Sequence, residues 1–263
     1  MTEILGILNV TRDSFSDGGR YLDCDAAVEH GLRLAADGAD VVDVGAESSH
    51  PDSEDVSEAE ELRRLEPVVE ALVERGVRVS VDTRRPVVAR RVAELGAEFI
   101  NDITGLREPQ MLEVLADNEA RCIVMHSISA AGRAERRDAP DAIVEHVVSF
   151  FEQRLEQAVA AGVERSRLVL DPGMGFFLGQ TPAASLAVLR NLECLRALSL
   201  PVCISTSRKS FLGELVGRPA EQRGAATLAS EIWAWTQGVE FVRTHDAGAL
   251  ADALRVLEAI QSE

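Results

Sequence analysis

The stretch "VSVDTRRPVVARRVAELGAEFIND", residues 79–102, contains the unit that decides the fold. It begins with a short β-branched run, continues with apolar residues at helical spacing, and ends in a second short run. A strand, a helix and a strand in this order are typical of a parallel sheet covered by helices. Each run also ends in polar residues, with Asp82 closing the first and Asn101 and Asp102 closing the second.

The same unit recurs along the whole chain. Strands are expected at residues 4–9, 41–45, 79–82, 99–102, 122–125, 168–171, 202–205 and 241–244. Helices are expected at residues 25–37, 57–75, 86–95, 109–117, 141–161, 182–198, 220–238 and 249–261. Eight such units in 263 residues predict an α/β protein with a single-domain (β/α)₈ TIM barrel, with an open doubly wound sheet and an added subdomain as the alternative.

Polar residues at the ends of the predicted strands favour the barrel. They are Asn9, Asp43, Asp82, Asn101 with Asp102, His126, Asp171, residues 205–209, and Arg243 with His245. In a (β/α)₈ barrel the carboxyl ends of all strands meet on one face, and active sites lie there. The pattern therefore predicts one active-site mouth built from most of the strands.

Composition excludes several classes of partner. The formal net charge of −17 opposes binding to nucleic acid or to an anionic membrane. No apolar run approaches the ~20 residues of a membrane span, and the first residues do not resemble a signal peptide, so a cytoplasmic protein is expected. The cysteines are widely spaced and show no zinc-site pattern, so they are interpreted as reduced thiols.

Three polar residues are expected at the bottom of the mouth. Asp82, Asn101 and Asp171 stand among apolar neighbours on three different strands. Buried carboxylates are costly unless they accept hydrogen bonds, and the amino-pyrimidine edge of a pterin or guanine offers adjacent N–H donors. The alternative is that these side chains bond only to strand ends and loops of the barrel.

A cationic side of the mouth is expected from Lys209, Arg243 and His245. They follow the last two predicted strands, where barrels often bind phosphate. Lys209 is the only lysine among 27 lysine and arginine residues, although an arginine-biased composition could leave one lysine by accident. Asn9 next to a diphosphate would suit Mg²⁺, which prefers a few protein oxygens together with waters and phosphate.

Eight ordered motifs then carry a resemblance. They are "GILNVTRDSFSDGG", "DVGAESSHP", "VSVDTRRP", "FINDITG", "VMHS", "LDPGMGF", "STSRKSFLG" and "VRTHD". In this order they resemble the dihydropteroate synthase family across residues 1–263. The resemblance implies a pterin-binding TIM barrel, usually a homodimer. It also implies a transferase of folate biosynthesis that joins 6-hydroxymethyl-7,8-dihydropterin diphosphate to para-aminobenzoate and releases pyrophosphate.

The resemblance also implies roles for individual residues. The pterin site would consist of Asp82, Asn101, Met125, Asp171, Gly175 and Lys209. The diphosphate site would consist of Asn9, Ser49, His50, Arg243 and His245, with Mg²⁺ on Asn9. The aminobenzoate site would consist of Pro51, Phe176, Phe177 and Ser207. Catalysis would rest on Asp82, Lys209, Arg243 and His245, with the diphosphate leaving before the amine attacks.

Some positions depart from the family pattern. Arg12 replaces a proline, and Ala46 and Ser49 replace glycine and threonine. His50 replaces an arginine, and because a histidine carries less charge at pH 7, a lower affinity for diphosphate is expected. The loop "GFFLGQTP" is two residues longer than the usual "GFGKTP". Together, "SHPD", "DPGMGFFL", "VMHS" and "SRKSFLG" resemble the sulfonamide-insensitive branch of the family. Phe177 and Leu178 could crowd a sulfonyl group beside the aminobenzoate site, although a harmless loop extension is the alternative.

Two other functions stay open at this point. A corrinoid-type pterin methyl-transfer domain would share the barrel and the acidic pocket, but it would not need the cationic residues of "SRKS" and "RTH". A non-catalytic pterin-binding paralogue would keep the barrel and lose turnover, which agrees with the changes at Arg12 and His50.

Overall fold

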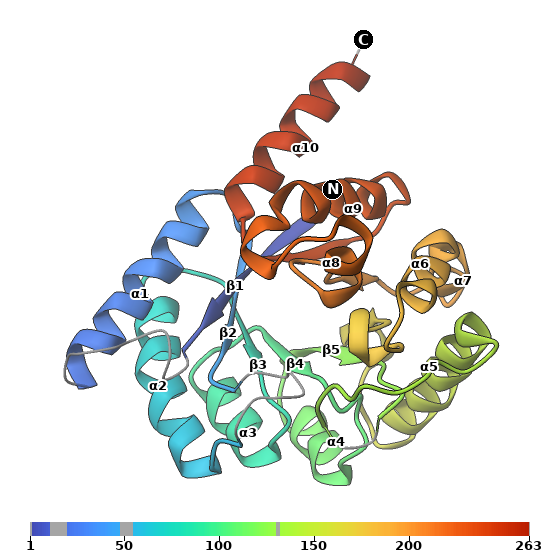
Figure 1. Cartoon of the computed structure of the whole chain (residues 1–263). Coiled ribbons are helices and arrows are strands. Elements are labelled where there is room, and N and C mark those ends of the chain that lie inside the picture. The colour runs from blue at the N-terminus through green and yellow to red at the C-terminus, as the bar shows by residue number, and fades with distance from the viewer. Residues whose placement is uncertain (1, 11–19, 48–54, 130–131, 263) are drawn as a thin grey trace.

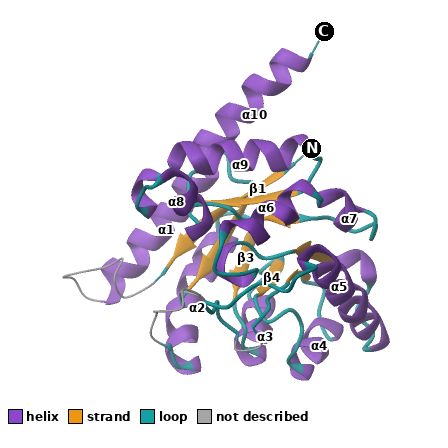
Figure 2. Cartoon of the chain, turned by 45° about the vertical axis from the view of Figure 1, so that its right-hand side comes forward, coloured by secondary structure: helices purple, strands orange, loops and turns teal. Residues whose placement is uncertain are grey.

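The computed structural model describes residues 2–10, 20–47, 55–129 and 132–262, with the side chains of residues 20–23 left out. Its centre is a single eight-stranded parallel sheet surrounded by helices (Figures 1 and 2). The strands are β1 (Glu3–Asn9), β2 (Val41–Gly45), β3 (Val79–Asp82), β4 (Phe99–Asp102), β5 (Arg121–Met125), β6 (Leu168–Asp171), β7 (Cys203–Ile204) and β8 (Phe241–Thr244).

The order of the strands makes the sheet a barrel. The hydrogen-bonded order is β6-β5-β4-β3-β2-β1-β8-β7, so that the first strand pairs with both the second and the last. The remaining gap between β6 and β7 is bridged by the Leu170 amide, which donates to the Pro201 carbonyl at 2.8 Å. The (β/α)₈ prediction is therefore confirmed, and the open doubly wound sheet is excluded.

The helices form the outer ring of the barrel. They are α1 (Arg20–Ala36), α2 (Glu58–Glu74), α3 (Pro86–Glu94), α4 (Pro109–Ala116), α5 (Ile143–Ala160), α6 (Pro182–Arg190), α7 (Leu192–Arg196), α8 (Ser210–Val216), α9 (Gly224–Thr236) and α10 (Ala247–Gln261). Their apolar faces pack on the outer surface of the strands in one large buried cluster.

The structure differs from the predicted helices in several places. The helix expected at 182–198 is interrupted at Asn191, whose side-chain amide donates to the Ala187 carbonyl at 2.8 Å. A short extra helix, α8, begins directly after β7 at Ser210. The helix expected at 220–238 consists of a 3₁₀ turn followed by α9. Asparagine competes with the helix backbone for hydrogen bonds, which accounts for the first break.

The inside of the barrel contains two layers of side chains. Residues two apart along a strand point to the same face, so one strand can contribute to both layers. The lower layer is an apolar cluster near the amino-terminal ends of the strands, formed by Leu5, Val41, Phe99, Ile123, Val169, Cys203 and Phe241. The upper layer lies toward the carboxyl ends and is polar, as described below.

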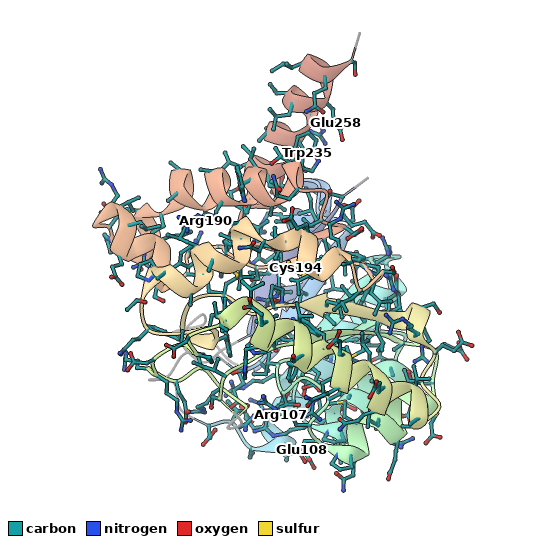
Figure 3. All side chains as sticks on the ribbon, turned by 90° about the vertical axis from the view of Figure 1, so that its right-hand side faces the viewer. Arg107, Glu108, Arg190, Cys194, Trp235 and Glu258 are labelled. Atoms are coloured by element: carbon teal, nitrogen blue, oxygen red, sulfur yellow. The ribbon has the colours of Figure 1, made fainter. Side chains whose placement is uncertain are left out.

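The four cysteines lie in different parts of the molecule. All four cysteines are free, with Cys122 and Cys203 buried in strands and Cys194 on the outer ring at α7 (Figure 3). Within the described ranges, no helix has both the length and the apolarity that a membrane crossing requires.

Candidate active site at the carboxyl end of the barrel

Arg243 lies at the centre of the polar layer. From β8 it reaches two carboxylates on other strands, with Nε 2.6 Å from Asp43 Oδ2 and Nη2 3.0 Å from Asp82 Oδ2. Asn101 on β4 donates through Nδ2 to the same Asp43 oxygen at 3.4 Å. Burial alone would lower the pKa of Arg243, but Asp43 and Asp82 outweigh it and raise the pKa. A permanent cation therefore joins three strands.

Asp43 was predicted among the strand-end residues of the mouth, but the sequence analysis gave it no binding or catalytic role. It is fully buried in β2, and its Oδ1 atom has no hydrogen-bond partner in the described part of the chain. The available signal was a single carboxylate in the strand "VVDVG", which is otherwise apolar apart from its glycine. Asn101 Oδ1 is also buried without a partner. Since buried polar atoms in proteins are nearly always paired, these two oxygens are ready to accept N–H donors from a ligand.

Two carboxyl groups of the site are electrostatically perturbed. Burial raises the pKa of Asp82 to about 7, although Arg243 opposes the shift. Burial raises the pKa of Asp171 to about 6, opposed by a hydrogen bond from the Gly173 amide at 2.8 Å and by Lys209. Groups whose protonation changes near neutral pH are typical of binding and catalytic sites.

Lys209 occupies the first position before α8, in extended backbone. Its ammonium nitrogen lies 4.8 Å from the centre of the Phe177 ring. Burial lowers the pKa of Lys209 to about 8, against the opposing attraction of Asp171 and Asp82. Gly175 has φ +65, and a Cβ atom there would lie 3.6 Å from both Cβ and Cδ of Lys209. That separation is an ordinary van der Waals contact, so it is the positive φ that favours glycine at this position.

Hydrogen bonds from Arg223 hold the backbone at Lys209, and the sequence analysis gave Arg223 no role. Arg223 Nη1 donates to the carbonyls of Arg208 at 2.7 Å and Lys209 at 3.3 Å. Arg208 itself has φ 57, an unfavourable conformation for a residue other than glycine. The guanidinium of Arg223 also packs against Gly213, where no Cβ atom could fit. These contacts fix the turn that aims Lys209 into the barrel.

His245 differs from its predicted role as a cation. Burial, followed by the charges of Arg208, Arg243 and Lys209, lowers its pKa to about 3, so the imidazole is neutral at pH 7. Its Nδ1 atom lies 2.9 Å from the Ser207 hydroxyl, and its backbone amide donates to that hydroxyl at 3.2 Å. Ser207, predicted for the aminobenzoate site, is therefore tied to His245 on the diphosphate side.

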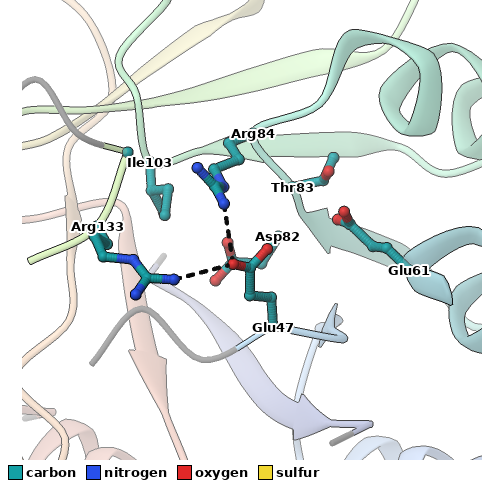
Figure 4. Close-up of a pocket in the computed structure, with 8 residues that line it drawn as sticks. Glu47, Glu61, Asp82, Thr83, Arg84, Ile103 and Arg133 are labelled. Carbon is teal, nitrogen blue, oxygen red and sulfur yellow. Dashed lines mark hydrogen bonds and ion pairs between the residues drawn. The ribbon is translucent and has the colours of Figure 1, made fainter. Parts of the chain in front are cut away.

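A pocket opens beside Asp82 at the rim of the barrel (Figure 4). Its walls are Glu47, Glu61, Asp82, Thr83, Arg84, Ile103, Gly132 and Arg133. Glu47 Oε1 lies 3.1 Å from Arg84 Nη2 and 3.4 Å from Arg133 Nη2, and Asp55 pairs with the same two arginines. This ion-pair network connects loops that follow β2, β3 and β5, and none of its members was predicted.

The loop after β6 limits the crowding hypothesis. Phe177 is 3% exposed and packs with Met125 and Ala134, while Phe176 is half-buried at their edge. Leu178 is fully buried in the large cluster between strands and helices. Leu178 therefore lies in a different cluster from Phe177, and of the two added residues Phe177 is the one that packs beside Met125.

The remaining predicted residues are placed as follows. Asn9 is exposed at the carboxyl end of β1. Arg12, Ser49, His50 and Pro51 lie outside the described residues. In the described part of the chain, no group of three or more histidine, cysteine, aspartate or glutamate side chains could hold a metal ion. A divalent ion at Asn9 would have to take most of its ligands from substrate and water.

Comparison with known proteins assigns this barrel to a class. Residues 5–245 match the family model described as pterin binding enzyme. A curated dihydropteroate synthase type-3 from Escherichia coli is 46% identical over 99% of this chain and all of its own length.

Two solved structures agree with this class. A Xanthomonas albilineans dihydropteroate synthase with 4-aminobenzoic acid is 41% identical, with a TM-score of 0.92 over 100% of this chain and 94% of its own. The same enzyme in complex with 7,8-dihydropteroate is 40% identical, with a TM-score of 0.88 and the same coverage. The chain belongs to the pterin binding enzymes and, within them, to the dihydropteroate synthase family.

Proposed function

We propose that this protein condenses 6-hydroxymethyl-7,8-dihydropterin diphosphate with para-aminobenzoate to form 7,8-dihydropteroate and pyrophosphate. The observation that carries the proposal is that charged and polar side chains from several strands meet at one end of the barrel. Asp82, Asn101 and Asp171, together with the cations Lys209 and Arg243, come from five strand ends around one mouth. Such a set can hold a heterocycle with N–H donors on one side and an anionic leaving group on the other.

The pterin would be held by the buried oxygens and by Lys209. Asp171 and the unpartnered Oδ1 of Asn101 accept the N–H donors of the amino-pyrimidine edge. The ammonium of Lys209 donates to an acceptor on the ring, and Met125 and Gly175 pack near its face. Protonation of Asp171 turns one of its oxygens from an acceptor into a donor that cannot pair with an N–H group, so pterin binding should depend on pH.

The diphosphate would lie toward β8 and β1. Arg243 uses Nε and Nη2 on carboxylates, and Nη1 makes no hydrogen bond within the described residues, so it can donate to a phosphate oxygen. The neutral His245 adds a hydrogen bond through its ring, and Asn9, Ser49 and His50 complete the site. Mg²⁺ fits the single exposed amide oxygen of Asn9 together with phosphate oxygens, and it would supply charge stabilisation for the departing group.

The arrangement supports departure of the diphosphate before attack of the amine. Asp82 faces the developing positive charge of the pterin methylene, while Arg243 and Lys209 stabilise the negative charge that leaves. Both effects come from groups that are already fixed by burial and ion pairs. No covalent enzyme intermediate is needed.

The aminobenzoate would lie against Phe176, Phe177, Pro51 and Ser207. We also propose reduced sensitivity to sulfonamides, because the added Phe177 side chain leaves less room for a sulfonyl group. Phe177 packs with Met125 beside Phe176, which supports this, whereas Leu178 is buried in a different cluster. We further propose that the protein is a cytoplasmic homodimer, as its family resemblance implies.

A coupled assay of pyrophosphate release tests the proposal. Turnover is expected with both substrates and Mg²⁺, and the inhibition constant of sulfamethoxazole should fall in Phe177→Ala. Joint deletion of Phe177 and Leu178 is unsuitable, because it would empty part of the core. Absence of turnover at saturating substrates with intact pterin binding would instead identify a non-catalytic paralogue. Ordinary drug sensitivity of the unmodified protein would remove the resistance claim.

A further inference from the structure

The contact between Lys209 and Phe177 joins two separate βα units. Phe177 lies in the loop after β6, and Lys209 lies between β7 and α8. The ammonium nitrogen is 4.8 Å from the centre of the ring, within the range of a cation–π interaction. Within the described part of the chain, Lys209 makes no ion pair or side-chain hydrogen bond, so the ring face is its contact group.

The Phe177 ring cannot easily leave this position. The Phe177 carbonyl accepts a hydrogen bond from the Ile128 amide at 3.0 Å, which ties the loop to the segment after β5. Met125 and Ala134 pack against Phe177 in a small apolar cluster. At Gly173, with φ +69, a Cβ atom would lie 3.0 Å from Phe177 Cβ, so the loop is packed closely on both sides.

The charges around Lys209 explain why contact with an uncharged ring, rather than with a carboxylate, suits substrate binding. Asp171 and Asp82 attract the ammonium, while Arg243 repels it. A direct ion pair with Asp171 would use ammonium donors and occupy the carboxylate that is proposed for the pterin. A ring face attracts the same cation electrostatically and leaves N–H donors and carboxylate oxygens for substrate.

We propose that Phe177 is a positioning residue for Lys209, holding the ammonium at the pterin edge of the pocket through the face of its ring. This inference rests on the proposed synthase function. It also explains why position 209 is a lysine in a chain whose other basic residues are arginine. A compact, rotatable ammonium can lie over one ring and still donate hydrogen bonds to substrate. Phe177 thus serves the pterin side as well as the aminobenzoate side.

The single lysine allows a direct test by nuclear magnetic resonance. Protein grown with lysine carrying ¹³C at Cε gives one side-chain signal, and the Phe177 ring current should move its proton resonance upfield of free lysine. Phe177→Leu should return the resonance toward the free position, and Phe177→Tyr should keep it upfield. Phe99→Leu is the matched control, since it removes a ring that contacts Arg121 at 4.6 Å in the lower layer.

Kinetics test the consequence for substrate. Phe177→Leu should lower kcat/KM for the pterin diphosphate about tenfold, as expected for loss of a buried cation–π contact. Phe177→Tyr should recover most of that loss, and Phe99→Leu should not change it. An unshifted Lys209 resonance in the unmodified protein would overturn the inference while leaving the synthase proposal intact. A Phe177→Leu defect confined to KM for aminobenzoate would also overturn it. Absence of turnover with a shifted resonance would instead contradict the proposed function.

Discussion

The two layers inside the barrel use the same strands for opposite purposes. In β2, β4, β6 and β8 the lower-layer side chain is Val41, Phe99, Val169 or Phe241, and all four are at most 2% exposed. Two residues later the same strands carry Asp43, Asn101, Asp171 and Arg243. A rise of about 6.6 Å along each strand therefore separates an apolar core from a charged site.

The difference shows where stability and function reside. The lower layer stabilises the barrel by burial of apolar surface, which needs no particular partner. The upper layer is stable only as a set, because each buried charge needs its neighbours. Substitutions in the lower layer should change stability alone, whereas those in the upper layer should change binding and, in some cases, increase stability.

The largest expected effect is on the stability of the upper layer. Arg243→Leu would leave Asp43 buried without its cation, so we expect a loss of about 3–5 kcal/mol in the free energy of unfolding. Urea denaturation followed by circular dichroism measures this loss. The double variant Arg243→Leu with Asp43→Leu should recover part of it. If Arg243→Leu were as stable as the unmodified protein, the buried carboxylate of Asp43 would not depend on Arg243.

The next largest effect concerns the identity of the cation. Lys209→Arg keeps the charge but places a planar fork over the Phe177 ring and into the pterin site. We expect kcat/KM to fall by on the order of 100-fold, the size seen when one electrostatic stabiliser is lost. The free energy of unfolding should change little. Turnover near that of the unmodified protein would make the single lysine an accident of composition.

A smaller effect is a dependence of stability on pH. Because Asp171 is protonated up to about pH 6 when folded and up to about 3.8 when unfolded, the folded state binds more protons between these values. Its protonation therefore stabilises the fold at low pH, and this stability is lost as the pH rises through the window. The variant Asp171→Asn has no such titration, so it should be more stable than the unmodified protein at pH 7 by up to about 3 kcal/mol.

Unfolding curves at pH 4 and pH 7 measure this difference, and the exposed Asp117→Asn serves as the control. Comparing each variant with the unmodified protein cancels the titration of Asp82 and His245. Equal stability of Asp171→Asn and the unmodified protein at pH 7 would mean that Asp171 is as well solvated when folded as when unfolded.

The smallest effect belongs to the lower layer. Ile123→Val removes one buried methylene among Phe99, Val169 and their neighbours, so we expect a loss of about 0.5–1.5 kcal/mol in unfolding free energy. The values of kcat and KM should stay unchanged. A clear kinetic defect would show that the lower layer also shapes the site, which would weaken the separation between the layers.

Most of the fold could be predicted because hydrophobic periodicity determines it directly. The bounds of β2, β3, β4, β6 and β8 agree with the predicted ranges. β7 is shorter than predicted, since its hydrogen bonds depend on how the barrel closes against β6 and β8. The break at Asn191 and the start of α8 also depend on local hydrogen bonds that periodicity does not report.

The site could be predicted in part. The topology of a barrel brings together residues at the strand ends, so Asp82, Asn101 and Arg243 could be expected near one another. The pairing of Asp43 with Arg243 and the role of Arg223 could not be predicted, because both depend on which atoms these side chains reach in the folded chain. The neutral state of His245 could not be predicted either, since burial and three nearby cations determine its pKa.

The most direct test of the two-layer account is the dissociation constant for 6-hydroxymethyl-7,8-dihydropterin diphosphate, measured by calorimetry without aminobenzoate. For Asp171→Ala we expect binding at least about tenfold weaker than for the unmodified protein, because a buried charge-assisted hydrogen-bond acceptor is lost. For Ile123→Val, one layer below, we expect an unchanged constant. Equal affinities for Asp171→Ala and the unmodified protein would contradict the assignment of the upper layer to the pterin.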